Sequence, residues 1–353
     1  MSARLQAPDR LPVTAVTGLP EAALARYLDG QGLGQGPLEV TRIGDGHSML
    51  TFAIRRAGAH LVLRRPPPPP LPRGFHDVLR EARIIAALAG QVPLAPLRAV
   101  CADESVIGAP FYVSDFVEGH VLAERTPAVF ADPAARRRIG ECVVDTLLAL
   151  HALDPAAVGL ADFGRPAGFL ERYVARYVRY WAASKTREIP AFDAVADWLA
   201  AHLPASRAAT IVHGDYRIGN LMFAPTLPVR LAAVLDWEMA ALGDPLVDLG
   251  YLTALWVQPE DPPLKFFELS GAVRAGGFHS RAELVARYAA GSDVNVEQWR
   301  WYEVLALWRL APMMEGNYRR AVAGEVVNPY LSEFGDGAVE LAERALAITR
   351  GEI

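Results

Sequence analysis

The first third of the chain alternates apolar and polar residues with the period of β-strands. The predicted strands are residues 38–43, 49–55, 60–64, 97–102 and 111–117. Between the third and fourth of these strands, apolar residues from His76 to Leu88 recur at helical spacing. The pattern therefore predicts about five strands and one helix in this part of the chain.

After Gly119 the apolar spacing changes to that of helices. The predicted helices include 134–153, 169–184, 192–202 and 297–320, and short strand pairs bracket Asn220 and Asp236. A strand-rich segment followed by a helix-rich one predicts an α+β fold. We expect two lobes, a small one with an antiparallel sheet at 1–117 and a larger, mainly helical one at 118–353. The hinge is expected at about 114–119.

The composition is that of a globular chain. Its 353 residues carry a formal net charge of −5 and 52% of them are hydrophobic, so a sizeable core can form. The acidic balance and the lack of a long Lys/Arg run argue against a nucleic-acid partner. Cys101 and Cys142 have no metal-type spacing, and we expect both to be reduced core residues.

No run of about 18 apolar residues offers a membrane span. Residues 1–11 lack the apolar stretch of a signal peptide. We therefore expect a cytoplasmic protein without a membrane partner.

The strongest chemical signal is the run His-Gly-Asp-Tyr-Arg-Ile-Gly-Asn, from His213 to Asn220. Asp236 follows 16 residues after Asn220, at the end of an apolar run. Phosphoryl transfer needs a carboxylate near the acceptor hydroxyl and oxygen ligands for Mg²⁺. Asp215, Asn220 and Asp236 supply that set. His-x-Asp also occurs by chance with a merely packed histidine, but the spacing of Asn220 and Asp236 favours function.

With these motifs the chain resembles the aminoglycoside phosphotransferase and choline kinase group, which has a bilobal protein-kinase-like fold. The similarity extends from about Leu38 to Arg320 and is closest to the kinase-like domain fused to some acyl-CoA dehydrogenases. The stretches that carry it are 61–67, 108–119, 213–220, 235–238, 243–248 and 308–319. The combination of His-Gly-Asp with Asp-Trp-Glu-x-Ala is specific to this group, whereas a Gly-rich loop alone is not.

The resemblance implies a role for each residue of the motif. Asp215 would orient or deprotonate the acceptor hydroxyl, and Asn220 and Asp236 would hold Mg²⁺. His213 would support the catalytic loop. Arg217 stands two residues after Asp215, where protein kinases carry a lysine that faces the γ-phosphate, so we expect it to stabilise charge there.

The nucleotide is expected to bind the first lobe. Gly44 and Gly46 would let the backbone approach phosphate, and Ser48 would donate a hydrogen bond to it. A simple hairpin turn is the alternative for the same residues. The family often has asparagine after this serine, and the resemblance does not extend to Met49 at that position.

On the third predicted strand, Arg64 stands where the resemblance places a lysine that pairs with the α- and β-phosphates. Its planar guanidinium is not equivalent to an ammonium group, although relatives also carry arginine here. Glu81, on the following helix, would pair with Arg64, and a solvated helix charge is the alternative. Arg65 and Arg80 are alternative cations for the same role.

Four other residues have defined expectations. By resemblance, backbone groups of Asp115 and Val117 would meet the adenine edge, and an ordinary core strand leading to a domain boundary explains them equally. Asp244 precedes Pro245 in the manner of a helix N-cap, so a structural role is favoured. Asp248 either braces the catalytic loop or lies on a helix surface.

Arginine and aromatic residues recur together on two predicted helices. They are Arg172, Tyr173, Arg176, Tyr177, Arg179, Tyr180 and Trp181 on one, and Trp301, Tyr302, Trp308, Arg309 and Arg319 on the other. Amphipathic helices with aromatic cores and snorkelling arginines explain this pattern. The alternative is an acceptor pocket with apolar walls and arginine ends, suited to a carboxylate or phosphate. The absence of a comparable acidic cluster makes a polycationic aminoglycoside a poor fit.

The sequence thus predicts a Mg²⁺- and ATP-dependent kinase that transfers the γ-phosphate to a hydroxyl of a small molecule, either acidic or CoA-linked. A silent nucleotide-binding pseudokinase or scaffold is the alternative, which Met49 and Arg64 allow and the intact Asp215, Asn220 and Asp236 oppose. A protein Ser/Thr kinase is disfavoured because no Asp-Phe-Gly, Ala-Pro-Glu or activation-segment motif is recognisable. The acceptor, the choice between ATP and GTP and the oligomeric state are not determined by the sequence.

Overall fold

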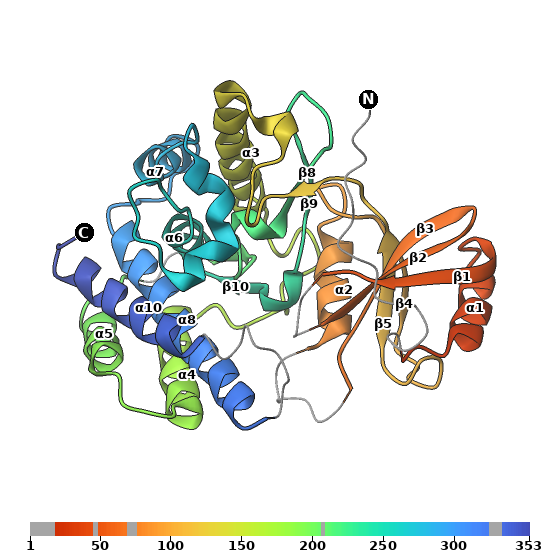
Figure 1. Cartoon of the computed structure of the whole chain (residues 1–353), viewed down its shortest axis with the longest axis horizontal. Coiled ribbons are helices and arrows are strands. Elements are labelled where there is room, and N and C mark those ends of the chain that lie inside the picture. Colours follow the sequence, from red (N-terminus) through yellow and green to blue (C-terminus); the bar gives the residue numbers. More distant parts are fainter. Residues whose placement is uncertain (1–17, 45–48, 69–75, 206–208, 325–333) are drawn as a thin grey trace. The chain divides into compact units, whose positions relative to one another are not determined.

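The computed structural model describes residues 18–44, 49–68, 76–205, 209–324 and 334–353. The chain divides into two compact units. Unit 1 comprises Met1–Ala89 and Leu94–Val117, and unit 2 comprises Gly90–Pro93 and Glu118–Ile353. The short loop Gly90–Pro93 belongs to unit 2 because Pro93 O accepts the backbone N–H of Val234 at 2.9 Å. The sheets and helices drawn in Figure 1 confirm the expected α+β fold.

Unit 1 is organised around an antiparallel sheet whose described strands have the order β1-β2-β3-β5-β4. They are β1 (Gln35–Arg42), β2 (Leu50–Ala57), β3 (Ala59–Arg65), β4 (Leu97–Cys101) and β5 (Phe111–Asp115). Every second residue of β2 and β3 faces the core, as Phe52 and Ile54 do on one strand and Leu61 and Leu63 on the other. The alternation in the sequence is therefore the alternation of the two sheet faces.

The described part of unit 1 contains two helices, α1 (Glu21–Gly30) and α2 (Val78–Ala87), where the sequence pattern predicts only the second. Leu24 and Leu28 of α1 are fully buried in the same core as the sheet. Two apolar positions four residues apart mark one helix face, but a ten-residue segment gives too short a periodic signal. Burial against the sheet, rather than local propensity, stabilises this helix.

Unit 2 is mainly helical. Its α-helices are α3 (Pro133–His151), α4 (Phe169–Ser184), α5 (Pro190–Ala201), α6 (Leu246–Ala254), α7 (Arg281–Ala290), α8 (Trp299–Val322) and α10 (Phe334–Thr349). Its 3₁₀ segments are η1 (Ala128–Phe130), η2 (Ile218–Asn220), η3 (Trp237–Met239) and η4 (Lys265–Ala275). Its short strands are β6 (His120–Val121), β7 (Thr210–Val212), β8 (Leu221–Phe223), β9 (Leu231–Val234) and β10 (Ala241–Gly243). Strands β6, β8 and β9 form one small sheet, and β7 pairs with β10 in another.

Aromatic residues fill the core between α4, α5 and α8. The rings of Trp181 and Phe192 stack at 4.5 Å, and those of Phe192 and Trp308 at 4.8 Å. The indole N–H of Trp308 donates to Phe192 O, and that of Trp301 donates to Leu199 O. Trp301, Tyr302 and Trp308 are all buried, so the aromatic-core interpretation of these residues is confirmed.

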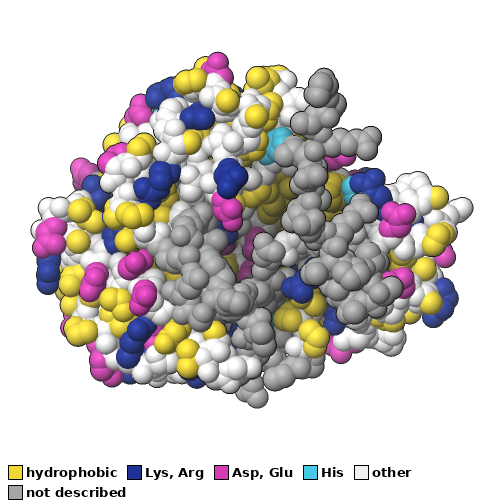
Figure 2. Space-filling view, viewed as in Figure 1, with side chains coloured by type: hydrophobic (Ala, Val, Ile, Leu, Met, Phe, Trp, Pro, Cys, Tyr) yellow, Lys and Arg dark blue, Asp and Glu magenta, His cyan; other side chains and the backbone are white. Residues whose placement is uncertain are grey.

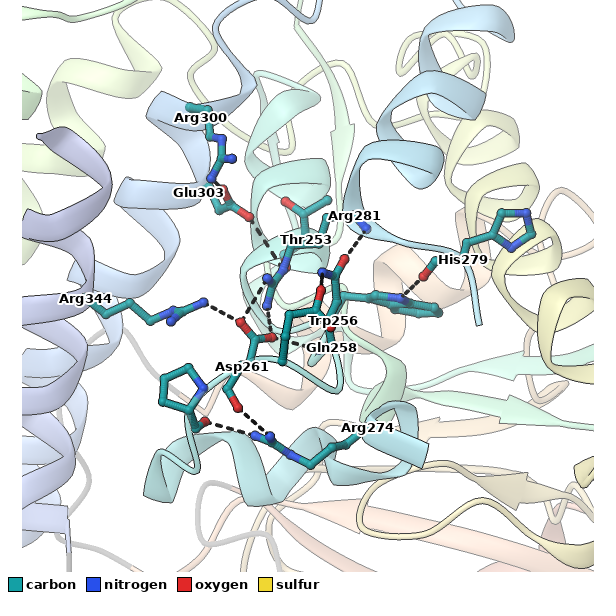
Figure 3. A network of polar contacts seen from close by, with 12 residues as sticks. Thr253, Trp256, Gln258, Asp261, Arg274, His279, Arg281, Arg300, Glu303 and Arg344 are labelled. Carbon is teal, nitrogen blue, oxygen red and sulfur yellow. Dashed lines mark hydrogen bonds and ion pairs between the residues drawn. The ribbon is translucent and has the colours of Figure 1, made fainter. Parts of the chain in front are cut away.

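A polar network joins α10 to the loop after α6 and to α7 (Figure 3). Its centre is Asp261, whose Oδ1 lies 2.7 Å from Arg344 on α10 and 3.1 Å from Arg281 on α7. The other carboxylate oxygen accepts a second hydrogen bond from Arg281 and the backbone N–H of Gln258. Charge-assisted bonds of this kind are stronger than neutral ones, so Asp261 ties three separate segments together.

Both cysteines are buried and free, as predicted, with Cys101 at 5% and Cys142 at 8% exposure. In the portion of the chain that the structure describes, no helix combines the length and apolarity needed to cross a membrane. On the face shown in Figure 2, acidic and basic side chains are interspersed among hydrophobic ones.

Candidate active site

The motif from His213 to Asn220 forms a loop between two short strands of unit 2. It begins directly after β7 and ends in η2, which runs into β8. Pairing of β7 with β10, with Val212 opposite Ala241, anchors the start of the loop. Pairing of β8 with β9, with Leu221 opposite Val234, anchors its end. We call residues 213–220 the catalytic loop.

Asp215 is held by the side chain at the other end of this loop. The amide nitrogen of Asn220 donates to Asp215 O at 2.9 Å and to Asp215 Oδ2 at 2.6 Å. Because both bonds use the NH₂ group, the amide oxygen of Asn220 is directed elsewhere. One side chain thus orients the partly exposed carboxylate of Asp215 and keeps an oxygen ligand available.

His213 is a buried structural residue of the loop, with 0% exposure. Its Nδ1 accepts the backbone N–H of Asp215 at 3.1 Å, and its Nε2 donates to Leu235 O at 2.9 Å. An N–H group can only donate and a carbonyl can only accept, so these partners select the tautomer protonated on Nε2. The ring also lies against Trp237, 4.6 Å between centroids. His213 therefore links the catalytic loop to the segment that contains Asp236.

Gly214 adopts a conformation and a packing that require glycine. Its φ is +82°, and an added Cβ would lie 2.5 Å from Met239 O. Its backbone N–H donates to Asp248 Oδ1 at 2.7 Å, and the neighbouring N–H of His213 donates to Asp248 Oδ2 at 2.6 Å. Asp248, on α6, is fully buried, so the interpretation as a brace of the loop is confirmed and the surface alternative is wrong.

The charge on Asp248 is compensated by its neighbours. Burial alone would raise the pKa of this carboxyl, but hydrogen bonding and charge from His151, with a smaller contribution from His213, lower it below its ordinary value. His151 Nε2 lies 3.3 Å from Asp248 Oδ2, and its Nδ1 lies 2.8 Å from the Tyr288 hydroxyl. The loop is thus supported by a chain of polar groups from α6, α3 and α7.

Asp236 reaches the loop through the β8–β9 hairpin. Asn220 directly precedes β8 and Asp236 comes just after β9, and Leu235 N donates to Asn220 O at 2.8 Å. Asp236 has φ +65° and ψ +66°, the left-handed region that non-glycine residues rarely adopt. Strain of this kind persists where surrounding structure imposes it and is concentrated at functional sites. The hairpin explains how residues 16 apart in sequence come to share a site.

Asn220 and Asp236 fit a magnesium ion better than a transition metal. They offer one amide oxygen and one carboxylate, and Mg²⁺ takes oxygen ligands from few protein groups together with phosphate and water. Within the described ranges, no group of three or more His, Cys, Asp or Glu residues could hold a metal ion. A closed metal centre of the zinc type is therefore not formed by those residues.

Arg217 lies beside the carboxylate of the loop. Its Nε is 3.8 Å from Asp215 Oδ2, and both side chains are about one-fifth exposed, at 21% and 22%. At this distance the guanidinium provides positive charge next to the carboxylate of Asp215. Its expected role toward phosphate stays a prediction.

Arg309 does not fit the alternative interpretation of helices α4 and α8, an open acceptor pocket with arginine ends. Arg309 is only 3% exposed. It donates to Gly214 O at 2.6 Å and to the Tyr173 hydroxyl, and its guanidinium lies 3.9 Å from the ring centre of Tyr251. Helix packing turns the side chain inward, beneath the catalytic loop, and uses both terminal nitrogens there.

Tyr251 is a residue of this site that sequence reasoning missed. Burial raises the pKa of Tyr251, and the charge of Asp215 and a hydrogen-bonding contact with it raise that pKa further. Tyr251 therefore lies close to both Asp215 and Arg309. In the sequence, Tyr251 resembles any other apolar position of a buried helix, and no neighbouring motif indicates a role in the site.

Asp244 has the structural role expected of it. Its Oδ1 accepts the N–H of Leu246 at 3.0 Å, at the start of α6, and its Oδ2 accepts the Tyr302 hydroxyl at 2.8 Å. These bonds fix the start of the helix that carries Asp248 and Tyr251.

In unit 1, Arg64 and Glu81 form the predicted ion pair. Arg64 Nε lies 3.0 Å from Glu81 Oε2, and the two side chains are 14% and 1% exposed. Tyr112 donates to the other Glu81 oxygen at 3.4 Å. The alternative cation Arg65 is used structurally, since it donates to Pro66 O and to Ile107 O. Arg64 is thus the arginine that Glu81 orients, and its role toward nucleotide stays a prediction.

Only some of the other residues predicted for the nucleotide site lie within the described ranges. Gly44 has φ +75°, which suits a tight turn, and Gly46 and Ser48 lie outside the described residues. Met49 is buried at 3% exposure, so it is a core residue.

Asp115 ends β5, and Val117 follows it outside regular secondary structure. The backbone N–H of Asp115 donates to Pro96 O, and its carboxylate binds Arg98. That amide hydrogen is therefore used within the unit. The role of these two residues toward adenine stays a prediction.

The chain is similar in sequence to known proteins. A sequence profile of the phosphotransferase enzyme family matches residues 39–305. Acyl-CoA dehydrogenase family member 10 of Mus musculus is 31% identical over 347 residues, which cover 97% of this chain and 32% of that protein. Family member 11 of Gallus gallus is 31% identical over 322 residues, with coverages of 89% and 41%. The chain therefore spans less than half the length of these relatives.

Solved structures give the same result for the fold. A Ralstonia eutropha protein assigned as an aminoglycoside phosphotransferase is 33% identical, with a TM-score of 0.80 over 94% of this chain and 99% of that one. A thermostable mutant of aminoglycoside phosphotransferase APH(4)-Ia, in complex with AMP-PNP and hygromycin B, has a TM-score of 0.60 at 16% identity. The match covers 92% of this chain and 98% of that one, and it shows the likeness in fold.

Proposed function

Because this chain belongs to the phosphotransferase enzyme family, we propose that it transfers the γ-phosphate of ATP to a hydroxyl group of a small molecule. The observation that carries the proposal is the contact between Asn220 and Asp215. One amide group holds the carboxylate at 2.6 Å and turns its own oxygen away from it. A silent nucleotide-binding protein would not need a carboxylate oriented in this way.

Asp215 is the group that meets the acceptor. In the proposed reaction the acceptor oxygen bonds to the γ-phosphorus as the bond from phosphorus to the bridging oxygen breaks, which leaves ADP and a phosphate ester. Asp215 accepts the hydrogen bond of the hydroxyl and takes up its proton as the ester forms. His213, Asn220 and Asp248 hold the loop so that this carboxylate needs little reorganisation.

Asn220 and Asp236 would hold the magnesium ions. When bound, Mg²⁺ neutralises the phosphate oxygens and the charge that develops on them. The residues of the chain supply a carboxylate and an amide oxygen, which is the donor set that this ion accepts with phosphate and water. Arg217, next to Asp215, adds positive charge on the same side of the loop.

Arg64 would bind the phosphates of the nucleotide. Glu81 holds its Nε at 3.0 Å, in a pair of which the carboxylate is almost wholly buried. A guanidinium oriented in this way can donate its terminal N–H groups to phosphate oxygens. Gly44, Gly46 and Ser48, and the backbone of Asp115 and Val117, complete the proposed nucleotide site.

We propose an acidic or CoA-linked acceptor. The exposed positions of α4 carry Arg172, Arg176 and Arg179, and the end of α8 carries Arg319 and Arg320. Arginine side chains suit carboxylate and phosphate groups. The relatives named for acyl-CoA dehydrogenases point in the same direction. A polycationic aminoglycoside would meet repulsion at these arginines.

The proposal is tested by γ-phosphate transfer from labelled ATP to a fractionated metabolite extract with Mg²⁺, with Asp215→Asn as the control. A labelled product made only by the unmodified protein supports it and provides the acceptor for identification. Mg²⁺-dependent ATP binding without transfer in any fraction would favour a silent nucleotide-binding protein. Absence of ATP binding would overturn the proposal.

A further inference from the structure

Arg309 places a buried positive charge directly beneath the catalytic loop. The residue lies on α8 and is 3% exposed, and its Nη2 donates to Gly214 O at 2.6 Å. Its Nη1 donates to the Tyr173 hydroxyl on α4, and the guanidinium covers the ring of Tyr251 on α6. Three helices and the loop thus meet at one arginine.

This arginine is poorly explained as a packing residue. Across the described ranges, no carboxylate lies within ion-pair distance of it, and its buried Nε–H has no hydrogen-bond partner. A buried charge with an unsatisfied donor is costly, and an apolar side chain of similar volume would often be at least as stable. The partners of Arg309 are instead the carbonyl of Gly214, the hydroxyl of Tyr173 and the ring of Tyr251. The cost of burial is therefore offset at the loop rather than by a separate salt bridge.

The contacts of Arg309 act on the peptide group that joins Gly214 to Asp215. Arg309 holds the carbonyl oxygen of that group, and His213 Nδ1 accepts its N–H at 3.1 Å. With both polar atoms bound, the peptide plane has one orientation, and that plane sets the direction in which the Asp215 side chain leaves the backbone.

We propose that Arg309 is a positioning residue for phosphoryl transfer: it fixes the Gly214–Asp215 peptide so that the Asp215 carboxylate faces the acceptor hydroxyl. The inference rests on the proposed function. Arg309 itself touches neither substrate nor nucleotide. Its loss should therefore lower kcat and leave the KM for Mg·ATP unchanged, because positioning of the carboxylate matters for the transfer step.

The test compares Arg309→Met, Arg309→Lys and Tyr173→Phe in Mg·ATP turnover, measured as phosphate release plus labelled product from a metabolite extract. We expect Arg309→Met to lower kcat about 100-fold with an unchanged KM for ATP. Arg309→Lys should recover part of that loss because it keeps one charged donor. Tyr173→Phe frees one nitrogen of Arg309 and should lower kcat by a factor of about 3–10.

Arg281→Met is the matched control. Arg281 is also a largely buried arginine of unit 2 that donates to a backbone carbonyl, Thr253 O at 2.9 Å. The Arg281→Met variant should be less stable than the unmodified protein but have the same kcat, because the contacts of Arg281 lie in the Asp261 network. If Arg309→Met does not fold, the comparison is made with Arg309→Lys and Tyr173→Phe.

Failure of this inference can be distinguished from failure of the proposed function. Unchanged kcat in folded Arg309 variants, or a change in KM alone, would overturn the inference and leave the proposed function intact. An unmodified protein that releases no phosphate and labels no product would overturn both.

Discussion

The carboxylate of Asp248 accepts the backbone N–H of His213 at 2.6 Å, although the two residues lie 35 positions apart. A second N–H, that of Gly214, reaches the other oxygen of the same carboxylate. Two charge-assisted bonds to a fully buried acid make the start of the catalytic loop dependent on α6.

Asp248→Asn should therefore weaken both fold and activity. An asparagine oxygen can accept one of the two amides, but its NH₂ group would face the other donor. We expect the free energy of unfolding to fall by about 3 kcal/mol and transfer to fall about 100-fold. Urea unfolding and labelled-ATP transfer measure the two effects. Asp145→Asn, at a half-exposed ion pair with Arg287, is the control and should behave as the unmodified protein.

The same carboxylate gives a pH dependence. The neighbouring histidines, chiefly His151, hold the pKa of Asp248 below its ordinary value against the effect of burial, so the group binds protons less readily in the folded state. Its contribution to stability is present above the unfolded pKa of about 3.9 and is lost as pH falls through the lower folded value. Asp248→Asn should therefore flatten the acid limb of the stability curve below about pH 4. An unchanged acid limb would contradict this assignment.

Asn220→Asp should abolish most activity while changing stability less. A carboxylate at this position cannot donate to Asp215 and would repel it at the present 2.6 Å contact. We expect a loss in kcat of about 100- to 1,000-fold, the range found when one preorganised hydrogen-bonding group is removed. The measurement is labelled-ATP transfer at several Mg²⁺ concentrations. Asn295→Asp, at an exposed turn before α8, serves as the control, and equal effects at both positions would argue against a role for Asn220.

Glu81→Gln should act on nucleotide binding. It removes the charge that holds Arg64, in a pair where Glu81 is 1% exposed. We expect the KM for ATP to rise about tenfold, equivalent to about 1.4 kcal/mol, with a smaller change in kcat. Titration with Mg²⁺ and a non-hydrolysable ATP analogue measures binding directly. Glu39→Gln, at an exposed site of β1, should bind as the unmodified protein; matching affinities for the two variants would remove Arg64 and Glu81 from the nucleotide site.

Asp261→Asn should reduce stability without reducing the turnover of folded protein. Asp261 is 8% exposed and binds Arg281 and Arg344, and loss of its charge removes the carboxylate that these two largely buried guanidinium groups share. Breaking such a pair costs about 3 kcal/mol or more. Urea unfolding and kcat measured on the same samples distinguish the effects. A drop in kcat at full folding would show that α10 influences the catalytic loop.

Local chemistry in the sequence was sufficient to predict much of this protein. Alternation along β2 and β3 marks a sheet buried on one face, because successive side chains of a strand point in opposite directions. His213, Asp215 and Asn220 lie within eight residues, so one loop brings them together. Only one short hairpin separates Asp236 from that loop, so the spacing in the sequence was enough to place Asp236 in the same site. The family resemblance rests on these same residues.

Tertiary structure alone decided what supports that loop. Arg309 and Gly214 meet across 95 positions, and the guanidinium of Arg309 covers the ring of Tyr251 only because α6 and α8 pack together. In the sequence, Arg309 is an arginine on an amphipathic helix, a pattern that fits a snorkelling surface residue as well as a buried one. Periodicity shows which residues share a helix face, but the direction of that face is set by the packing of the whole unit. The same reason explains α1, whose two buried leucines acquire a partner only when the sheet has formed.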